Sequence, residues 1–456
     1  MAPAVRMPGA VAVAALAVLL LVAPYPASAT NFVNLPAFSG AGQGMAGADS
    51  VSVLDTSLIN SNPGALFLLP RSTDPDPKGW FDGGVANFTL GYLQPFLHHT
   101  DQFGSSRDDE NIPVLAVHGG FAAHVREIPR LTVGVGLFTQ GGLGTDFRSL
   151  NTAFGTRDDS TSFLRHIKLA FAVSYEIVDG LSIGIAPHIS YADFSFRVFP
   201  KTSAGVAFSG VDIGNRCQRN LGLGEPGSDC PWDVTGGAKV GVAWKVTPMV
   251  TVGLAYTSPA NFHFHSGEGK LNFSSLGLGR VSYDVDALGF QWAQRVEAGL
   301  AVRPTPRLLL ALDASWDDWS ANKDVKLRFN NPRSFVPDAL RNVTVKITHD
   351  WKDQFMVALG AAYDVVPNMF TVRGGYNWAS NPLRERTFDP AVQVPFEHHI
   401  AVGAGWKPWK RWELDAGFYY ALPKKVTYAN PELPYGTRAT ENPQGFQLDV
   451  TMGYRF

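Results

Sequence analysis

Apolar and polar side chains alternate along much of the chain, and the alternation is clearest at its C-terminal end. There, one parity is held by Phe446, Leu448, Val450, Met452, Tyr454 and Phe456, and the other by Gln447, Asp449, Thr451, Gly453 and Arg455. The same period of two recurs in residues 167–175, 181–191, 355–364 and 412–420. Because successive side chains of a strand point to opposite faces, the pattern predicts strands with one apolar face. A soluble sandwich alternates in the same way, so alternation alone does not choose between a sandwich and a barrel.

The connections between the predicted strands are alternately tight and long. Tight connections fall at 127–130, 178–180, 246–248, 303–306, 365–368 and 407–410. Long polar segments fall at 97–112, 148–161, 199–232, 266–285, 321–343, 380–393 and 422–441. Short turns at one rim and long loops at the other are typical of an outer-membrane barrel, whose turns face the periplasm. We therefore predict an all-β, transmembrane antiparallel β-barrel of about 14 strands.

The N-terminus has the pattern of a secretory signal peptide. Arg6 precedes an uncharged apolar stretch from Ala10 to Ala23, and Ala27-Ser28-Ala29 follows a proline-bearing region. The apolar stretch is shorter than the about 20 residues that a membrane-spanning helix needs. We expect residues 1–29 to be a cleaved signal that exports the chain to the bacterial outer membrane.

Residues 30–78 do not follow the strand pattern and are rich in Gly, Ala and Ser. A closed sheet of about 14 strands encloses more space than its own side chains fill. The inward-facing positions of the predicted strands also carry many small residues, which leaves room for a further segment. We therefore predict an N-terminal hatch, or plug, at 30–78 inside a barrel formed by 79–456. Asp449 and Arg455, near the periplasmic rim, are the candidates for docking this hatch.

Composition excludes several other classes of protein. The chain has 38 basic and 40 acidic residues, a net charge of −2, which gives no general basic character for binding nucleic acid. Cys217 and Cys230 are the two cysteines, and in an exported chain we expect them to form a disulfide within one long loop. Neither has a histidine within a few residues, so no metal site is predicted, and no cofactor is expected.

Three functional classes suit an outer-membrane barrel. A lipid hydrolase would need a nucleophile, a base and an orienting group together, and the histidines fall in no recognisable nucleophile motif, so no enzyme is expected. A general porin for small polar solutes usually constricts its pore with an inserted loop and opposed rows of charge. Phe194, Phe196 and Val198 instead share the inward parity of their strand, which favours a hydrophobic ligand. A bulge near Asp193 would reverse that inference.

The sequence resembles the FadL/TodX family of outer-membrane channels for long-chain fatty acids and hydrocarbons. The resemblance covers the mature chain, from Phe38-Ser39-Gly40-Ala41-Gly42 through Asn62-Pro63-Gly64-Ala65 and 315–320 to an aromatic C-terminal residue. The hatch motif of the family usually reads Asn-Pro-Ala, and here Gly64 stands before Ala65. The resemblance implies passive uptake of a hydrophobic compound. By position it also implies substrate contacts at Phe138 and, for a carboxylate, at Arg197 and Lys323.

Members of this family have an inward kink in their third strand that opens a lateral gap in the wall. The corresponding residues are 139–147, where Gly141, Gly142 and Gly144 permit the backbone excursions that interrupt a strand ladder. The resemblance implies release of the substrate into the membrane through this gap, with the Asn62-Pro63 turn beside it. The expected partners are the hydrophobic substrate, membrane lipid and lipopolysaccharide, and the barrel-assembly machinery. We expect a monomer, and the sequence does not choose between fatty acids and hydrocarbons.

Overall fold

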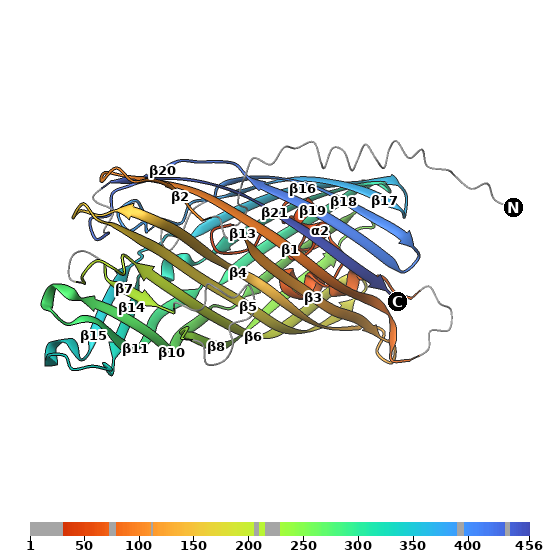
Figure 1. Ribbon diagram of the computed structural model, residues 1–456. Coiled ribbons are helices and arrows are strands. Elements are labelled where there is room, and N and C mark those ends of the chain that lie inside the picture. The colour runs from red at the N-terminus through yellow and green to blue at the C-terminus, as the bar shows by residue number, and fades with distance from the viewer. Residues whose placement is uncertain are drawn as a thin grey trace.

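The computed structural model describes residues 31–72, 79–110, 113–204, 209–214, 229–389, 396–433 and 438–456, with Leu143 by its backbone alone. These residues form a long barrel of steeply inclined strands (Figure 1). The predicted signal peptide at 1–29 lies outside the described residues. No helix among the described residues is both long and apolar enough to cross a membrane.

A single antiparallel sheet closes on itself to form the wall. The shortest closed path of pairings begins at β1 (Phe81–Asp101) and returns to it through β21 (Ala439–Arg455). Between them the path runs through β3 (Val114–Val125), β4 (Leu131–Asn151), β5 (Arg157–Val178), β6 (Leu181–Val198), β8 (Trp232–Lys245), β9 (Val250–Thr257), β12 (Arg295–Thr305), β13 (Leu308–Asp317), β16 (Gln354–Val366), β17 (Phe370–Ala379), β18 (His398–Trp409) and β19 (Trp412–Ala421).

The shortest closed path has fourteen strands, but the sheet as a whole has more than the about 14 that were predicted, because several segments interpreted as loops are strands. Among the described residues the sheet has 21 strands. The additional ones are β2 (Ser106–Asp108), β7 (Val211–Ile213), β10 (Ala260–Phe273), β11 (Gly279–Trp292), β14 (Asp324–Asn330), β15 (Val343–Thr348) and β20 (Val426–Tyr428). Strands β7 and β10 join β6 to β8 near the rim, and a closed wall traced through them has sixteen strands. The segments 266–285 and 321–343 were interpreted as loops because they are polar overall. Within them, however, Val281, Tyr283 and Val285, and likewise Val325, Leu327 and Phe329, alternate with polar residues and face the interior.

The two faces of the wall differ as the alternation predicts. Leu448, Val450 and Met452 of β21 are exposed on the outside, while Gln447, Asp449 and Thr451 between them are buried inside. Other strands expose outward side chains of the same kind, among them Phe88, Leu90, Phe171, Val173, Ile183, Ile185, Leu359 and Val402. An outward apolar band with a polar interior is the pattern of a membrane-spanning barrel.

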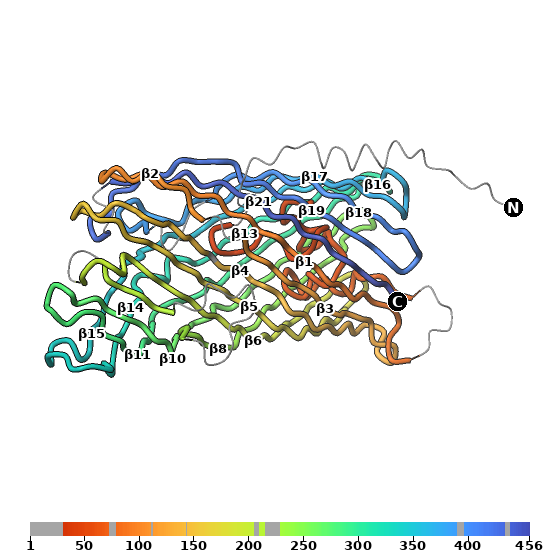
Figure 2. Tube along the Cα trace, viewed as in Figure 1, coloured from red at the N-terminus to blue at the C-terminus, as the bar shows by residue number. Residues whose placement is uncertain are grey.

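The N-terminal segment, residues 31–69, packs against the inward face of the wall. It contains α2 (Gly40–Gly44), α3 (Leu58–Ser61) and the 3₁₀ helix η1 (Pro63–Leu68). Helix α2 contacts β17, β18, β19 and β21, whereas η1 contacts β5, β6, β8 and β9 on another side of the barrel. Figure 2 shows this segment, in red and orange, within the tube of strands. Nearly all its residues are buried, so the segment fills this part of the interior.

Small residues on both partners allow this close packing. A Cβ atom at Gly40 would lie 2.5 Å from the carbonyl oxygen of Asp415 in β19, and one at Gly64 would lie 2.6 Å from that of Gly241 in β8. On the wall, a side chain at Gly184 or Gly403 would overlap the backbone of the segment. The inward glycines therefore let backbone pack directly against backbone.

Candidate functional site

An apolar cavity of about 80 Å³ lies in the half of the barrel distant from the C-terminus. It is bounded by β5 and β6 on one side and by β10, β11, β14 and β15 on the other. Its lining consists of Ser162, Phe163, Leu164, Phe194, Ser195, Phe196, Phe264, Ala287, Phe290, Val325, Leu327, Ile347, His349 and Trp351. The rings of Phe194 and Phe264 meet edge to face at 5.0 Å. Of the strands that bound it, β14 lies within a segment that the sequence analysis assigned to a loop, and β10 and β11 lie partly within another.

The structure brings together some of the residues predicted to bind substrate. Phe194 and Phe196 line the cavity. Val198 is buried one step further along β6 and is not among the lining residues. Phe138 is also buried, but its ring packs against Phe38 of the N-terminal segment at 5.7 Å, away from the cavity. The prediction that one parity of β6 faces inward therefore identified two residues that line the cavity, Phe194 and Phe196.

The two predicted cations do not reach the cavity. Arg197 forms an ion pair with Asp212 of β7 at 3.0 Å, and Lys323 pairs with Asp350 at 3.3 Å. The described lining residues include no Lys, Arg, Asp or Glu. His349, in the connection between β15 and β16, stacks on Trp351 at 4.4 Å, and burial lowers its pKa to about 4. The ring is therefore uncharged at neutral pH, and the whole lining is neutral.

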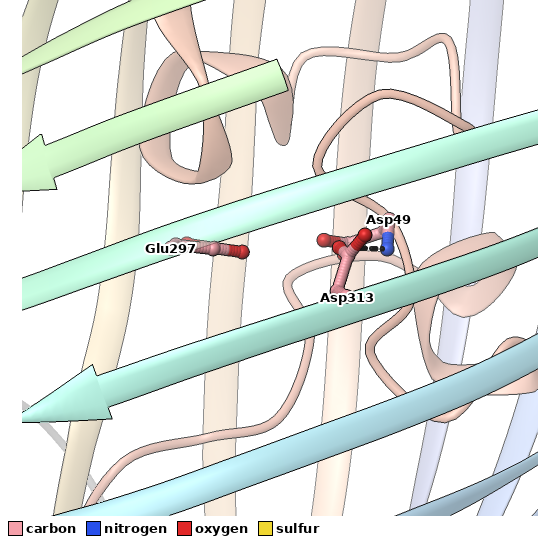
Figure 3. Close-up of side chains that lie close together, drawn as sticks. All are labelled: Asp49, Glu297 and Asp313. Carbon is pink, nitrogen blue, oxygen red and sulfur yellow. Dashed lines mark hydrogen bonds between the residues drawn. The ribbon is translucent and has the colours of Figure 1, made fainter. Parts of the chain in front are cut away.

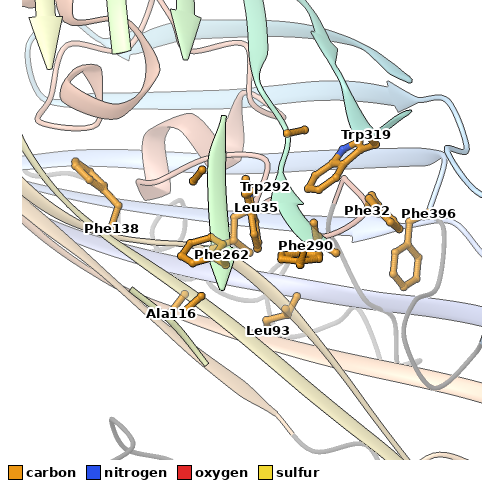
Figure 4. Packing of buried hydrophobic residues seen from close by; sticks show 14 of the residues in the cluster. Phe32, Leu35, Leu93, Ala116, Phe138, Phe262, Phe290, Trp292, Trp319 and Phe396 are labelled. Carbon is orange, nitrogen blue, oxygen red and sulfur yellow. The ribbon is translucent and has the colours of Figure 1, made fainter. Parts of the chain in front are cut away.

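Aromatic side chains connect this cavity to the N-terminal segment. Phe32 of the segment makes edge contacts with Trp319 at 5.2 Å and with Trp351 at 5.1 Å. Figure 4 shows Phe32 among Trp319, Trp292, Phe290 and Phe262. The N-terminal segment therefore contacts Trp351, one of the residues that line the cavity.

Hydrogen bonds from Asn34 fix the position of the N-terminal segment next to these aromatic side chains. The indole nitrogen of Trp292 donates to Oδ1 of Asn34 at 2.9 Å, and Nδ2 of Asn34 donates to Asp317 at 2.9 Å. Asp317 also binds Arg295 at 2.6 Å. Both the oxygen and the nitrogen of the Asn34 side-chain amide are therefore hydrogen-bonded to the wall.

The pairing between β3 and β4 is interrupted. The two strands pair from His124 and Thr132 up to His118 and Phe138. Beyond Phe138, the next backbone bridge in the described part of this seam joins Phe147 to Asp109. We call residues 139–146 of β4 the β4 edge. At the end of the β4 edge next to Phe138, the hydroxyl of Thr139 bonds to Val117 of β3. It accepts from the amide of Val117 and donates to the carbonyl oxygen of Val117, both at 3.1 Å.

The N-terminal segment, rather than β3, pairs with the β4 edge. Asn34 forms a β-bridge with Gly141. The amide of Gly142 donates to the carbonyl oxygen of Val33 at 2.9 Å, and the amide of Leu35 donates to that of Gln140 at 3.2 Å. On the other side, the register with β5 shifts between Thr139 and Gly141.

The glycines of the β4 edge differ in how closely neighbouring atoms approach them. A side chain at Gly141 would overlap the carbonyl oxygen of Val33, and one at Gly142 would overlap that of Leu164. A Cβ atom at Gly144 would be 3.4 Å from the nearest oxygen, an ordinary contact. None of the three has a positive φ. These glycines therefore act by allowing neighbouring backbone to approach closely and not through a positive φ, while the expected irregularity of the ladder is present as the register shift between Thr139 and Gly141.

The Asn62-Pro63 turn packs against Val242 of β8 and Gly184 of β6. The side-chain oxygen of Asn62 accepts a hydrogen bond from the amide of Gly64 at 3.0 Å and so caps the start of η1. The side-chain nitrogen of Asn62 donates to the carbonyl oxygen of Val242 in β8 at 3.2 Å. The turn itself does not pair with Gly141, although Asn60, two residues before it, donates to the side chain of Gln140 at 3.0 Å. The residues that contact Gly141 come instead from the start of the segment.

The predicted docking charges are also only partly right. Asp449 is buried close to Gly40, and its carboxylate accepts from Gln447 at 2.8 Å. Arg455 binds Glu413 at 2.6 Å, within the wall, and so does not dock the segment. The predicted pairing of Cys217 with Cys230 stays a prediction, because Cys217 lies outside the described residues.

Other inward polar residues dock the segment. Asp313 of β13 accepts hydrogen bonds from the amides of Asp49 at 2.9 Å and Ser50 at 2.8 Å, and Thr451 accepts from that of Gly40 at 2.8 Å. Figure 3 shows Asp313 beside Asp49, with Glu297 further along. These three carboxylates could together face a metal ion. Asp313 is engaged by two amides and Glu297 by Lys239 at 3.2 Å, however, so the group acts as a docking network.

Comparison with known proteins identifies the family. The family model described as outer membrane protein transport protein (OMPP1/FadL/TodX) matches residues 19–456. The chain belongs to this family. The resemblance seen in the sequence is thereby confirmed, as is an outer-membrane β-barrel. A family of transport proteins also fits the expectation that the chain is not an enzyme.

Solved structures of similar fold support the assignment. The Pseudomonas putida toluene transporter TodX has a TM-score of 0.72 at 18% identity, with 92% of this chain and 99% of that chain covered. A Pseudomonas aeruginosa FadL homologue has a TM-score of 0.68 at 16% identity, with 93% and 99% covered. The Ralstonia pickettii toluene transporter TbuX has a TM-score of 0.66 at 19% identity, with 92% and 98% covered. At these identities the likeness establishes the fold.

One curated relative matches over a shorter stretch. The 47 kDa outer membrane protein of Pasteurella multocida is 24% identical over 154 residues, which are 33% of this chain and 32% of that protein. The matched stretch thus spans about a third of the relative's length.

Proposed function

We propose that this FadL/TodX-family protein is a passive channel that takes up hydrophobic compounds across the outer membrane. The observation that carries the proposal is the neutral, largely apolar cavity bounded by β5, β6, β10, β11, β14 and β15. Such a lining gains about 25 cal/mol per Å² of apolar surface that it removes from water, so it would concentrate a hydrophobic solute. The named relatives TodX and TbuX, described as toluene transporters, support this substrate class.

The path from the cavity would lead to the β4 edge. Phe163 and Leu164 of β5 line the cavity, and Leu164 pairs with Leu143 of β4. A hydrophobic solute released between β3 and β4 would enter lipid and would not cross water. Residues 33–35 occupy this edge and would act as the gate, so that the segment 31–69 is a hatch that must shift before the substrate leaves.

A general porin suits these observations less well. A porin needs a continuous aqueous lumen. Here buried residues of the segment 31–69 occupy the interior, bonded to strands on several sides of the barrel. Charged groups of the described interior are paired with one another or with this segment in most cases, for example Arg373 with Asp415 at 2.6 Å.

A pair of matched substitutions tests the role of the cavity. Ala287→Phe would place a ring in the cavity, whereas Ala298→Phe would place the same ring on the exposed outer face of β12. We expect uptake of a hydrophobic fluorescent tracer by intact cells to fall severalfold with Ala287→Phe. It should stay at the wild-type level with Ala298→Phe at equal surface expression. Equal uptake by both variants would show that the substrate does not pass through the cavity.

A further inference from the structure

His349, in the connection between β15 and β16, lines the apolar cavity and is held firmly in place. Its amide donates to the carbonyl oxygen of Lys323 at 2.8 Å, and its own carbonyl oxygen accepts from the hydroxyl of Thr387 at 2.6 Å. Its ring stacks on Trp351, with the centroids 4.4 Å apart and the planes at 18°. The ring therefore has a fixed position at the wall of the cavity.

The two ring nitrogens of His349 have no partner in the protein. The residue is only 5% exposed, and neither nitrogen is hydrogen-bonded to any residue that the structure describes. Because burial lowers its pKa to about 4, the ring is uncharged at neutral pH and offers one N–H donor and one acceptor. Buried polar groups are nearly always hydrogen-bonded, and an unpaired one is costly. We therefore expect a partner to reach the ring of His349 from the cavity.

Other interior histidines differ from His349 in this respect. Both ring nitrogens of His124 are hydrogen-bonded, to the carbonyl oxygen of Leu69 at 2.8 Å and to the hydroxyl of Thr132 at 3.0 Å. The nitrogens of His118 are also without partners, but His118 is not among the residues that line the apolar cavity. His349 therefore combines unpaired nitrogens with a place at the cavity wall.

The rest of the lining favours an aromatic ligand. The ring of Phe264 lies 5.0 Å from that of Phe194 and 6.1 Å from that of Phe290, and all three line the cavity. Such edge and tilted contacts are the ones that aromatic rings prefer. The cavity volume of about 80 Å³ holds roughly five to eight water-sized groups at about 10–15 Å³ each, which suits a compound of one ring.

We propose that His349 is a specificity-determining residue whose ring forms a hydrogen bond with the hydroxyl group of a phenol, so that the channel prefers neutral phenols to hydrocarbons of the same shape. A hydroxyl group suits this position because it can donate to the acceptor nitrogen or accept from the N–H group. The aromatic body of the phenol would lie among Phe194, Phe264 and Phe290. A site that hydrogen-bonds a hydroxyl group disfavours the analogue without one, because the nitrogen is then left unpaired. This inference rests on the proposed function and deepens it.

The test compares p-cresol with p-xylene, two compounds of the same shape in which a hydroxyl group replaces a methyl group. Each is titrated into the purified full-length protein in an uncharged detergent, and binding is followed by calorimetry. His349→Phe keeps a ring beside Trp351 and removes both nitrogens, whereas His263→Phe makes the same change at an exposed position of β10. We expect His349→Phe to weaken p-cresol binding about tenfold, about 1.4 kcal/mol, and to leave p-xylene binding within about twofold of wild type. His263→Phe should match wild type with both compounds.

The outcomes separate this inference from the proposed function. If the wild type binds p-xylene and His349→Phe binds p-cresol as the wild type does, the hydrogen-bonding role of His349 is wrong while the hydrophobic cavity stands. If His349→Phe weakens both compounds equally, His349 acts through packing alone, and the inference is again overturned. If neither compound binds to the wild type, the proposed function fails as well.

Two further measurements test the hydrogen bond and the ring separately. His349→Gln keeps a donor and an acceptor, so it should retain part of the preference for p-cresol over p-xylene. A loss of preference equal to that of His349→Phe would overturn the hydrogen bond. 4-Methylcyclohexanol carries its hydroxyl group on a ring that is not aromatic, and it should bind more weakly than p-cresol. Equal binding of these two compounds would overturn phenols as the substrate class.

Discussion

Substitution of Gly141 by alanine should release the start of the N-terminal segment from β4. The new methyl group would overlap the carbonyl oxygen of Val33, so the bridge between Asn34 and Gly141 cannot persist as it is. Two backbone hydrogen bonds flank this bridge, from Gly142 to Val33 and from Leu35 to Gln140. At about 0.5–1.5 kcal/mol each, their loss amounts to about 1–3 kcal/mol of docking free energy. The undocked population should therefore rise roughly 5–150-fold.

Hydrogen exchange measures this change directly. The amides of Leu35 and Gly142 are protected by the bonds in question, and their exchange reports the local opening. Gly144→Ala is the matched control, since its methyl group meets nothing closer than 3.4 Å. We expect faster exchange at both amides in Gly141→Ala alone, together with faster uptake of a hydrophobic tracer. Equal exchange in the two variants would refute the reasoning that residues 33–35 are held at the β4 edge by close approach to Gly141.

Three further predictions concern other parts of the molecule. Asp313→Ala removes the acceptor for the amides of Asp49 and Ser50. Hydrogen exchange at these two amides should become faster by the equivalent of about 1.5–3 kcal/mol of opening free energy, and unchanged protection would contradict the docking role. Burial lowers the pKa of His349 from 6.5 to about 4, so the stabilisation from the neutral ring is full above 6.5 and is lost as pH falls toward 4. Affinity of the folded protein for an apolar probe should weaken as pH falls through about 4, where the His349 ring becomes charged, and a His349→Phe variant that keeps the same pH profile would exclude this cause. The predicted disulfide between Cys217 and Cys230 should leave no thiol to label until reductant is added, and equal labelling in both states would disprove it.

The sequence determined the class of fold because alternation is a local property. A strand of any barrel must turn one parity of side chains to lipid, so β21 shows Leu448, Val450 and Met452 outside whatever the rest of the chain does. Small inward residues likewise indicated that another segment fills the interior. The family resemblance added the expectation of a hydrophobic substrate, and the inward parity of β6 identified Phe194 and Phe196.

Tertiary structure alone decided which groups meet, because the functional contacts join residues far apart in the chain. Asn34 touches Gly141 and also Trp292 and Asp317, and no local pattern connects these positions. Strand β14 and parts of β10 and β11 fell in segments that were interpreted as loops because they are polar overall. Together with β15, these strands supply six of the fourteen residues that line the apolar cavity. Pairing partners also decided the role of each charge. An inward lysine or arginine can be seen in the sequence, but whether a carboxylate faces it depends on the registers of several strands around a closed wall.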